Sequence, residues 1–474
     1  MIRLAFKTAI ALTTGLALTA ILAFAFPCQA QTESDESSVA IATGASDKSA
    51  NVIIPNWSRV LKDYVLIPPP TPDPQATGPA GPTPTARPTD RVKVREFLAP
   101  WRETYAAIRF GPKYINAAVG GFEQGAGLGL GFEFTTADKF SWVEFRATAL
   151  VSTVFDRRIR LDAVFPKIGD ERTHANLWFN YMLIRGWPFY GLGPRTPQAT
   201  RTSFQLEKRS YNGLFQRDFN YRMKAGVYAG LSNSGATNGN ADVPPINQFF
   251  SGNPAVTPII AWAPGLDMNA EIFYYGLYGE YDGRNNERGL TKGFYLYGMY
   301  GSWDGIDNGA LFTDYGWLWG LFDAKAYIPL GSDKTSFAAR VFGSFQNPKG
   351  GSQIPFYYQS FIGGRLYVRG FRNFRFRANN ALVLSTELRQ TVWTQTDTRG
   401  LDIHAFGDAG QAWGDNRSKT DPQVLANNKF SSSNWRFGIG GGITYRYSRA
   451  FAVRIELGHS NETNLVYFSL TRGF

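Results

Sequence analysis

The chain has very little cysteine, histidine and charge for its length. It has 474 residues, of which one is Cys and three are His, and Asp, Glu, Lys and Arg together make up 18%. Beyond the N-terminal segment, no uncharged apolar stretch approaches the roughly 18 residues that a membrane-spanning helix needs. The sequence therefore excludes a helical membrane protein. Because the one cysteine, Cys28, lies in that N-terminal segment, a chain that loses this segment has no disulfide.

The three histidines do not form a pattern typical of catalysis or metal binding. His174 lies in a polar run, His404 on the polar face of an expected strand, and His459 after a strand end. None has the spacing of a metal-binding pair, and no nucleophile elbow, phosphate-binding loop or dinucleotide-binding motif is present. We therefore expect no catalytic residue, no metal and no cofactor, and we do not expect an enzyme. A lipid hydrolase that uses His459 and Ser460 is the alternative kept open.

Aromatic residues and glycine are abundant instead. The chain has 37 Phe, 23 Tyr, 12 Trp and 50 Gly, and its aromatic fraction is 15%. This much apolar surface excludes disorder of the whole chain. Two classes remain, a large soluble all-β protein and an outer-membrane barrel.

The first 30 residues are typical of an export signal. Arg3 and Lys7 precede an apolar stretch from Ala9 to Phe26, and a small residue, Ala30, ends the segment. We predict a signal peptide at residues 1–30, with an uncleaved anchor as the alternative. The formal net charge is +11, and in an exported protein this favours anionic lipid headgroups or an Arg-lined interior over nucleic acid as partner.

Residues 31–96 change in composition and are predicted to be a disordered Pro-rich tail. Nine of the 26 prolines lie between Pro68 and Pro88, and such a segment cannot bury enough surface to order itself. The apolar stretch 51–67 within it could serve as a docking segment. We expect the ordered domain to cover residues 97–474.

Alternation of apolar and polar residues recurs throughout residues 97–474. Phe145 alternates with Glu144 and Arg146, and further on Leu161 lies between Arg160 and Asp162. Paired charges on the polar face are unusual for a soluble sandwich, whereas a wall with lipid outside and a charged lumen explains both faces. The prediction is an all-β fold, a transmembrane antiparallel β-barrel of about 16 strands. The aromatic runs 273–281 and 293–300 are expected to form interfacial girdles.

The C-terminal segment resembles the signal read by the machinery that assembles bacterial outer-membrane barrels. Phe468, Leu470 and Phe474 share one face of the last expected strand, and the chain ends on an aromatic residue. Arg472 departs from the usual pattern, because an apolar residue is typical of its position. The resemblance implies a location in the bacterial outer membrane and the barrel-assembly machinery as a partner during biogenesis.

A second motif lies in the segment GGRLYVRGFRNFRFRANNALVLSTELRQTVW, residues 363–393. Its core, Val368, Arg369, Gly370 and Phe371, followed by STEL and then by FGDAGQAW, resembles the BamA/TamA (bacterial surface antigen) superfamily. The resemblance implies that the VRGF motif lies on a loop folded into the lumen. It also implies that Arg369 contacts acids on later strands, here Glu387 and Asp408. Five arginines in 13 residues would repel one another unless lumen carboxylates faced some of them. The alternative is a solvated hairpin or one that binds lipopolysaccharide phosphates.

Further segments share this resemblance, which extends over about residues 97–474. They are residues 188–196, 281–296 and 436–443. Members of the superfamily that insert or export proteins carry periplasmic POTRA domains of about 75 residues. Residues 31–95 do not show the pattern of such a domain, so the chain resembles the subgroup that lacks them.

The resemblance implies outer-membrane assembly, or translocation of protein or lipid through a lateral seam between the first and last strands. Outer-membrane lipids and lipopolysaccharide are the expected partners, with a periplasmic partner of the Pro-rich tail as one further option and no nucleic acid. A gated or plugged, porin-like diffusion channel is the alternative, followed by the lipid hydrolase.

Overall fold

The structure is a computed structural model, and it describes part of the chain in detail. The described residues are 104–109, 115–121, 128–136, 140, 142–240, 243–252, 261–284, 292–307, 315–396, 399–414, 428–447 and 452–469. The predicted signal peptide (1–30) and Pro-rich tail (31–96) lie outside these ranges, as do Leu470 and Phe474 of the predicted assembly signal. Among the described residues, no helix is long and apolar enough to cross a membrane.

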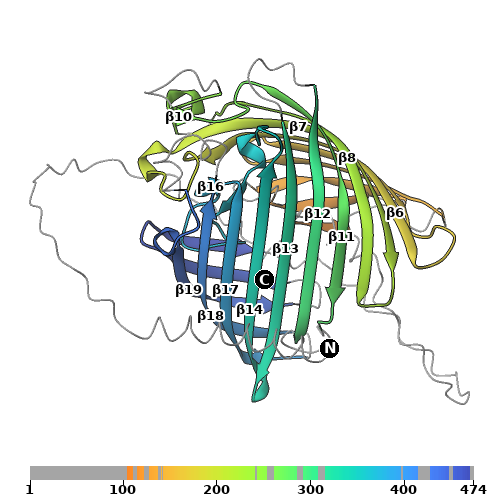
Figure 1. The fold of residues 1–474 in the computed structure, drawn as a ribbon. Coiled ribbons are helices and arrows are strands. Elements are labelled where there is room, and N and C mark those ends of the chain that lie inside the picture. The colour runs from red at the N-terminus through yellow and green to blue at the C-terminus, as the bar shows by residue number, and fades with distance from the viewer. Residues whose placement is uncertain are drawn as a thin grey trace, which may run out of the picture. The chain divides into compact units, whose positions relative to one another are not determined.

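One antiparallel sheet of 17 strands makes up most of the described residues, and each strand pairs with the next along the chain (Figure 1). Its strands are β1 (Thr104–Arg109), β2 (Ile115–Gly121), β3 (Leu128–Thr135), β4 (Glu144–Ser152), β5 (Arg157–Phe165), β6 (Thr173–Phe189), β7 (Thr202–Asp218), β8 (Met223–Asn238), β11 (Asn269–Asp282), β12 (Gly293–Asp307), β13 (Gly316–Leu330), β14 (Ser332–Pro348), β17 (Asn380–Thr394), β18 (Gly400–Trp413), β19 (Arg436–Arg446), β20 (Ala452–His459) and β21 (Asn464–Ser469). The expected all-β antiparallel architecture is confirmed, with 17 strands in place of about 16.

The remaining elements are short and belong to the connections. Two small pairs of strands are β9 (Phe250–Ser251) with β10 (Ala261–Trp262), and β15 (Ser360–Ile362) with β16 (Phe376–Ala378). The 3₁₀ turns are η3 (Gln198–Thr200), η4 (Ile246–Gln248), η5 (Phe356–Tyr358) and η7 (Ser432–Asn434).

The two faces of the sheet differ in the way that the alternation predicts. Phe145, Ile159 and Leu161 are exposed large apolar side chains, whereas Arg160 is buried and bonded to Asp162 (2.7 Å). Exposed apolar residues occur on strands throughout the sheet, among them Leu277, Leu296, Ile443, Leu457, Val466 and Phe468. An outward apolar face and an inward face of paired charges are the arrangement of a wall between lipid and a polar lumen.

The connection between β14 and β17 packs against the inner face of the sheet. Val368 and Phe371 from this connection are fully buried, in one cluster with Val383 of β17 and Ala412 of β18. In a second buried cluster, Phe374 and η5 pack against the C-terminal half of β6 and the first residues of β7. The VRGF segment is therefore held by packing as well as by charge.

The two aromatic runs that we expect to form interfacial girdles are exposed on one face only. Tyr275, Leu277 and Tyr300 are exposed, but Tyr278 and Tyr297, from the same two runs, are buried in the inner cluster. Both faces of β11 and β12 are aromatic, so alternation alone could not show that one of the faces forms a core.

Candidate functional site

The VRGF motif lies between the short strands β15 and β16, which pair antiparallel. Val368 and Phe371 anchor the motif because both are buried, and the Phe371 ring packs edge-on against Phe376 at 5.5 Å. Arg369, between these two anchors, is only 3% exposed. A guanidinium buried to this extent requires compensating charge close by.

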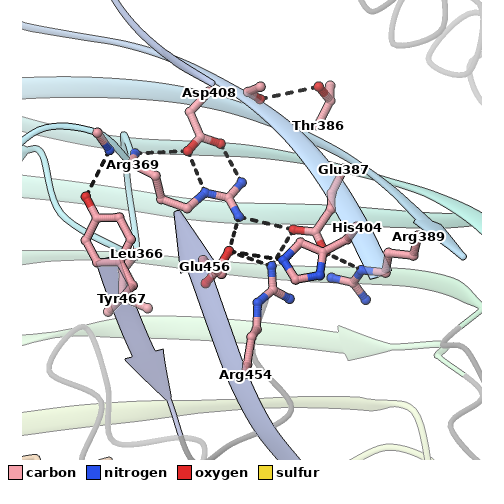
Figure 2. Close-up of polar contacts among 12 residues, drawn as sticks. Leu366, Arg369, Thr386, Glu387, Arg389, His404, Asp408, Arg454, Glu456 and Tyr467 are labelled. Carbon is pink, nitrogen blue, oxygen red and sulfur yellow. Dashed lines mark hydrogen bonds and ion pairs between the residues drawn. The ribbon is translucent and has the colours of Figure 1, made fainter. Parts of the chain in front are cut away.

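The principal contact of Arg369 is with Asp408 of β18. Its Nε donates to Oδ2 at 2.7 Å and its Nη2 donates to Oδ1 at 2.8 Å, and the Arg369 main-chain N–H donates to Oδ2 at 2.9 Å (Figure 2). A two-point pair of this kind fixes the orientation of the side chain as well as its position. Asp408 thus holds both the backbone and the side chain of the motif.

Two further carboxylates complete the surroundings of this guanidinium. Nη1 of Arg369 donates to Glu387 of β17 at 3.1 Å and to Glu456 of β20 at 2.7 Å. Arg454 lies against the same two acids at 2.7 and 2.8 Å, and Arg389 lies 2.6 Å from Glu387. Figure 2 shows these charged side chains meeting at one point. Three acids and three arginines balance, and the network is buried.

The electrostatics keep Arg369 charged. Burial alone would lower the pKa of the Arg369 guanidinium, but Asp408, and then Glu387 and Glu456, raise that pKa above its ordinary value. The face of the Phe406 ring lies 3.4 Å from the guanidinium carbon and adds a cation–π contact. Since this positive charge is present at every physiological pH, the network behaves as a permanent clamp.

Two glycines allow the loop to approach the wall so closely. Gly370 has φ +94°, and a Cβ there would lie 2.5 Å from the carbonyl oxygen of His459. A Cβ on Gly438 of β19 would lie 1.8 Å from the carbonyl oxygen of Arg369. Any side chain at either position would push the motif away from the strands.

The last strand and the turn before it also hold the motif. The main-chain N–H of Gly370 donates to the Tyr467 hydroxyl at 2.9 Å, and that hydroxyl donates to the carbonyl of Phe371 at 3.2 Å. The Gly370 carbonyl accepts from Ser460 at 2.8 Å and from Thr463 at 2.6 Å. One short loop is thus bonded to β17, β18, β20, β21 and the turn between the last two strands.

The loop also holds a segment from an earlier connection. Arg375 bonds Glu462 at 2.6 and 2.9 Å, and it donates to the carbonyl of Thr196 at 2.7 Å. The main-chain N–H of Gly193 donates to the carbonyl of Arg377 at 2.7 Å. The segment 188–196, part of the sequence resemblance, therefore lies directly against the VRGF loop.

Glu387, His404 and Glu456 lie close enough for their ligand atoms to converge within 4.8 Å. Each carboxylate, however, already accepts hydrogen bonds from arginine, with Arg369 and Arg454 bonded to both. Cations at these oxygens oppose the binding of a metal ion there. The two carboxylates bind the arginines that hold the VRGF loop.

His459 and Ser460, the two residues of the hydrolase alternative, are hydrogen-bonded to other groups and not to each other. Nδ1 of His459 lies 2.6 Å from the side-chain oxygen of Asn464, and the Ser460 hydroxyl donates to the Gly370 carbonyl. A nucleophilic serine has to be bonded to its base, and these contacts direct the two side chains to different partners.

Phe468 is the one residue of the predicted C-terminal assembly signal that lies in the described ranges. It is exposed on the outer face of β21, together with Val466, which is 72% exposed. Apolar side chains on this side of the strand point outward, away from the lumen.

Comparison with known proteins supports the family resemblance of the VRGF motif. The sequence profile of the Omp85 superfamily domain matches residues 275–464, a span that contains the VRGF motif and all three of its acids. Over these residues the chain matches an Omp85 superfamily domain. The resemblance to the BamA/TamA superfamily is thereby confirmed. No curated protein sequence matches the chain.

Several solved structures are similar to this chain. The crystal structure of BamA from Haemophilus ducreyi lacking POTRA domains 1–3 aligns with a TM-score of 0.56 at 14% identity, covering 80% of this chain and 77% of that one. CdiB from Escherichia coli gives 0.48 at 13% identity, with coverage of 77% and 63%. CdiB from Acinetobacter baumannii gives 0.42 at 13%, with coverage of 75% and 58%. The chain is an integral outer-membrane β-barrel protein.

The site contains residues that the sequence alone did not identify. The structure brings Arg369 together with Glu387 and Asp408, the two expected acids, but it adds Glu456 and Tyr467. The alternation in β20 places Glu456 on a polar face, and that was the only signal for it. Nothing in the sequence relates it to a loop that lies 87 residues earlier.

Proposed function

We propose that this Omp85 barrel takes part in outer-membrane assembly, or in the translocation of protein or lipid, through a lateral seam. The observation that supports it most is the loop clamp, the set of contacts from Arg369 and Gly370 to β17, β18, β20 and β21. This clamp stiffens the C-terminal side of the sheet up to its last strand. Because the strands before it are held by the clamp, the part of the wall that can move is the free edge of β21.

The two ends of the sheet are suited to such a seam. β1 and β21 are six residues each, and no pairing joins them within the described residues. A strand with one free edge presents unpaired N–H and C=O groups, which another strand can bond. The edge of β21 is thus available to a client strand or opens toward lipid.

Outer-membrane lipids are the partners that the outer surface supports. Leu277, Leu296 and Val466 are among its most exposed apolar residues, and they lie on β11, β12 and β21. Acyl chains cover such a surface at no cost in polar desolvation. We propose lipopolysaccharide as a partner of this surface as well. Two further proposed partners are the assembly machinery and a periplasmic partner of the Pro-rich tail. The segments that would bind them include residues outside the described ranges.

A photo-crosslinking residue at Val466 tests the seam. We expect adducts with a second outer-membrane protein, or with lipid, that depend on β21. The matched control is the same residue at Leu277, which is similarly exposed but lies on β11, between paired strands. Identical adducts at both positions, or none at Val466, would overturn the proposal.

A gated channel is the second candidate, because buried clusters and the loop fill the lumen side of the described sheet. A channel of this kind conducts only when the loop moves. The hydrolase is less well supported, since Ser460 and His459 are bonded to other groups. We therefore propose a non-enzymatic role.

A further inference from the structure

Four connections meet at one end of the sheet. They are β6–β7 (190–201), β14–β17 (349–379), β18–β19 (414–435, described at 414 and 428–435) and β20–β21 (460–463). Arg375 of the second donates to the Thr196 carbonyl of the first at 2.7 Å and to Glu462 of the fourth at 2.6 Å. Arg195 of the first donates to the side-chain oxygen of Asn434 in the third at 3.0 Å. The four connections are therefore neighbours in space.

The lengths of the connections indicate which end of the barrel this is. The longest of the four covers residues 349–379, whereas at the other end Gly331 alone joins β13 to β14, and residues 219–222 join β7 to β8 (Figure 1). Outer-membrane barrels have short periplasmic turns and longer extracellular loops. We infer that the four connections lie on the extracellular side of the membrane.

The described residues of these connections are strongly basic. Glu462 is their only acid. Their basic residues are Arg195, Arg201, Lys349, Arg365, Arg369, Arg372, Arg375, Arg377 and Lys429. So many like charges repel one another unless acids of the strands, or a bound anion, lie close to them.

Acids of the strands compensate some of these cations but not all. Arg369 is held by the clamp, and Lys349 pairs with Asp304 of β12. Arg201 and Arg372, in contrast, have no hydrogen-bonded or ion-paired partner for their side chains among the described residues. Both residues are half-buried, so part of each side chain is open to solvent.

Two further arginines at this end bind neutral groups. Arg195 donates to the side-chain oxygens of Asn434 and Ser433 at 3.0 and 2.9 Å. Arg436, the first residue of β19, donates to the Pro194 carbonyl at 2.5 Å. Neither forms an ion pair within the described part of the chain. Arg195, Arg201, Arg372 and Arg436 are called the basic patch below.

Arg201 and Arg372 belong to different connections but lie beside the same residue, Tyr190. The Thr200 hydroxyl donates to the Tyr190 carbonyl at 2.7 Å, which places Arg201 next to this tyrosine. Burial raises the pKa of the Tyr190 hydroxyl, and the nearby charges of Arg201 and Arg372 oppose that rise. Two cations without acidic partners therefore act on one place, where their attraction for an anion adds up.

From these features we propose that the basic patch is a binding site for a phosphate group. The fork of a guanidinium group matches the oxygens of a phosphate two at a time. A phosphomonoester carries a charge of about −1.5 to −2 at neutral pH, so it offsets more of the excess positive charge than one carboxylate does. Its oxygens also accept hydrogen bonds from several arginines at once.

The phosphate group has two sources, a phosphorylated lipid headgroup of the outer leaflet and free phosphate. The first source would deepen the proposed partnership with lipopolysaccharide. The site does not depend on the lateral seam, so crosslinking at Val466 and phosphate binding can each fail while the other succeeds.

Isothermal titration of the purified full chain in detergent micelles tests the site. The probes are inorganic phosphate, with acetate as its matched carboxylate, and lipid A, with dephosphorylated lipid A as its matched lipid. We expect at least one phosphorylated probe to bind saturably and about tenfold more tightly than its match. Tighter binding of lipid A than of inorganic phosphate assigns the site to a lipid headgroup, and equal binding assigns it to free phosphate.

Variants connect the affinity to the basic patch. The double variant Arg201→Gln and Arg372→Gln should weaken binding of the phosphorylated probe about tenfold without lowering the thermal midpoint, because it removes charges that have no acidic partner. Arg217→Gln is the matched control, since Arg217 is exposed and pairs with Asp170 at the other end of the sheet. The proposal is wrong if neither phosphorylated probe binds more tightly than its match, or if the control variant weakens binding as much as the double variant.

Discussion

The guanidinium and the main-chain N–H of Arg369 both donate to a single carboxylate, that of Asp408. Asp408→Asn replaces one acceptor oxygen by a donor and leaves a buried guanidinium without its two-point partner. Breaking a buried pair of this kind costs about 3–5 kcal/mol. We expect the loop to leave the wall and trypsin to cleave it after Arg372. The measurement is the rate of tryptic cleavage of the folded protein.

Asp402→Asn is the matched control for that substitution. Asp402 lies on the same strand and is buried in a two-point pair with Arg446 at 2.7 and 3.0 Å, but it does not contact the loop. It should lower the thermal midpoint and leave the cleavage rate of the loop unchanged. Equal cleavage in the two variants would mean that general destabilisation, and not the clamp, protects the loop.

Gly370→Ala should release the loop for a steric reason. The new Cβ would lie 2.5 Å from the His459 carbonyl oxygen, in a backbone conformation with φ +94°. We compare it with Gly331→Ala, where φ is +68° and no atom lies within 4 Å. Strain alone costs about 1–3 kcal/mol, so Gly331→Ala should lower the thermal midpoint slightly. Only Gly370→Ala should accelerate tryptic cleavage of the loop, and similar cleavage in both variants would contradict the close-packing argument.

Tyr467→Phe should loosen the contact between the loop and the last strand. It removes two hydrogen bonds, to the N–H of Gly370 and to the carbonyl of Phe371. The loss is about 1 kcal/mol per bond, so the thermal midpoint should fall by a few degrees, and Val466 crosslinking should increase as β21 becomes more mobile. Tyr445→Phe, on the exposed face of β19, should change neither quantity. Unchanged crosslinking in Tyr467→Phe would mean that the contact of the loop with β21 does not control the seam.

The channel alternative predicts a change in conductance. Arg369→Ala removes the charge on which Asp408, Glu387 and Glu456 converge, so the loop should be displaced and planar-bilayer conductance should rise sharply above that of the wild type. Arg446→Ala, which leaves the clamp intact, should conduct like the wild type. Equal, near-zero conductance in all three proteins would exclude the channel.

The alternation of side chains was sufficient to predict the fold. The exposure of Phe145 and Leu161, and the burial of Arg160, follow from period-2 patterning alone. The patterning was not sufficient where both faces are aromatic, as in β11 and β12. There it could not show that Tyr278 and Tyr297 pack inward, because lipid and a lumen core select the same residue types.

The candidate site could be predicted only in part, for a different reason. The motif resemblance named Arg369, Glu387 and Asp408, and the polar face of β20 contained Glu456 without assigning it a partner. Contacts across a lumen depend on the curvature and register of the whole sheet, which a local pattern does not encode.

The bonds of the VRGF loop also have an order in time. Arg369 and Gly370 are synthesised 39, 87 and 97 residues before the partners Asp408, Glu456 and Tyr467. Bonds between residues so far apart form late in folding, since the chain between them must first be closed into a loop. The contacts of the VRGF loop with β18, β20 and β21 therefore cannot exist until these strands have been made, so the free energy that they contribute reaches the loop only when the C-terminal strands are in place.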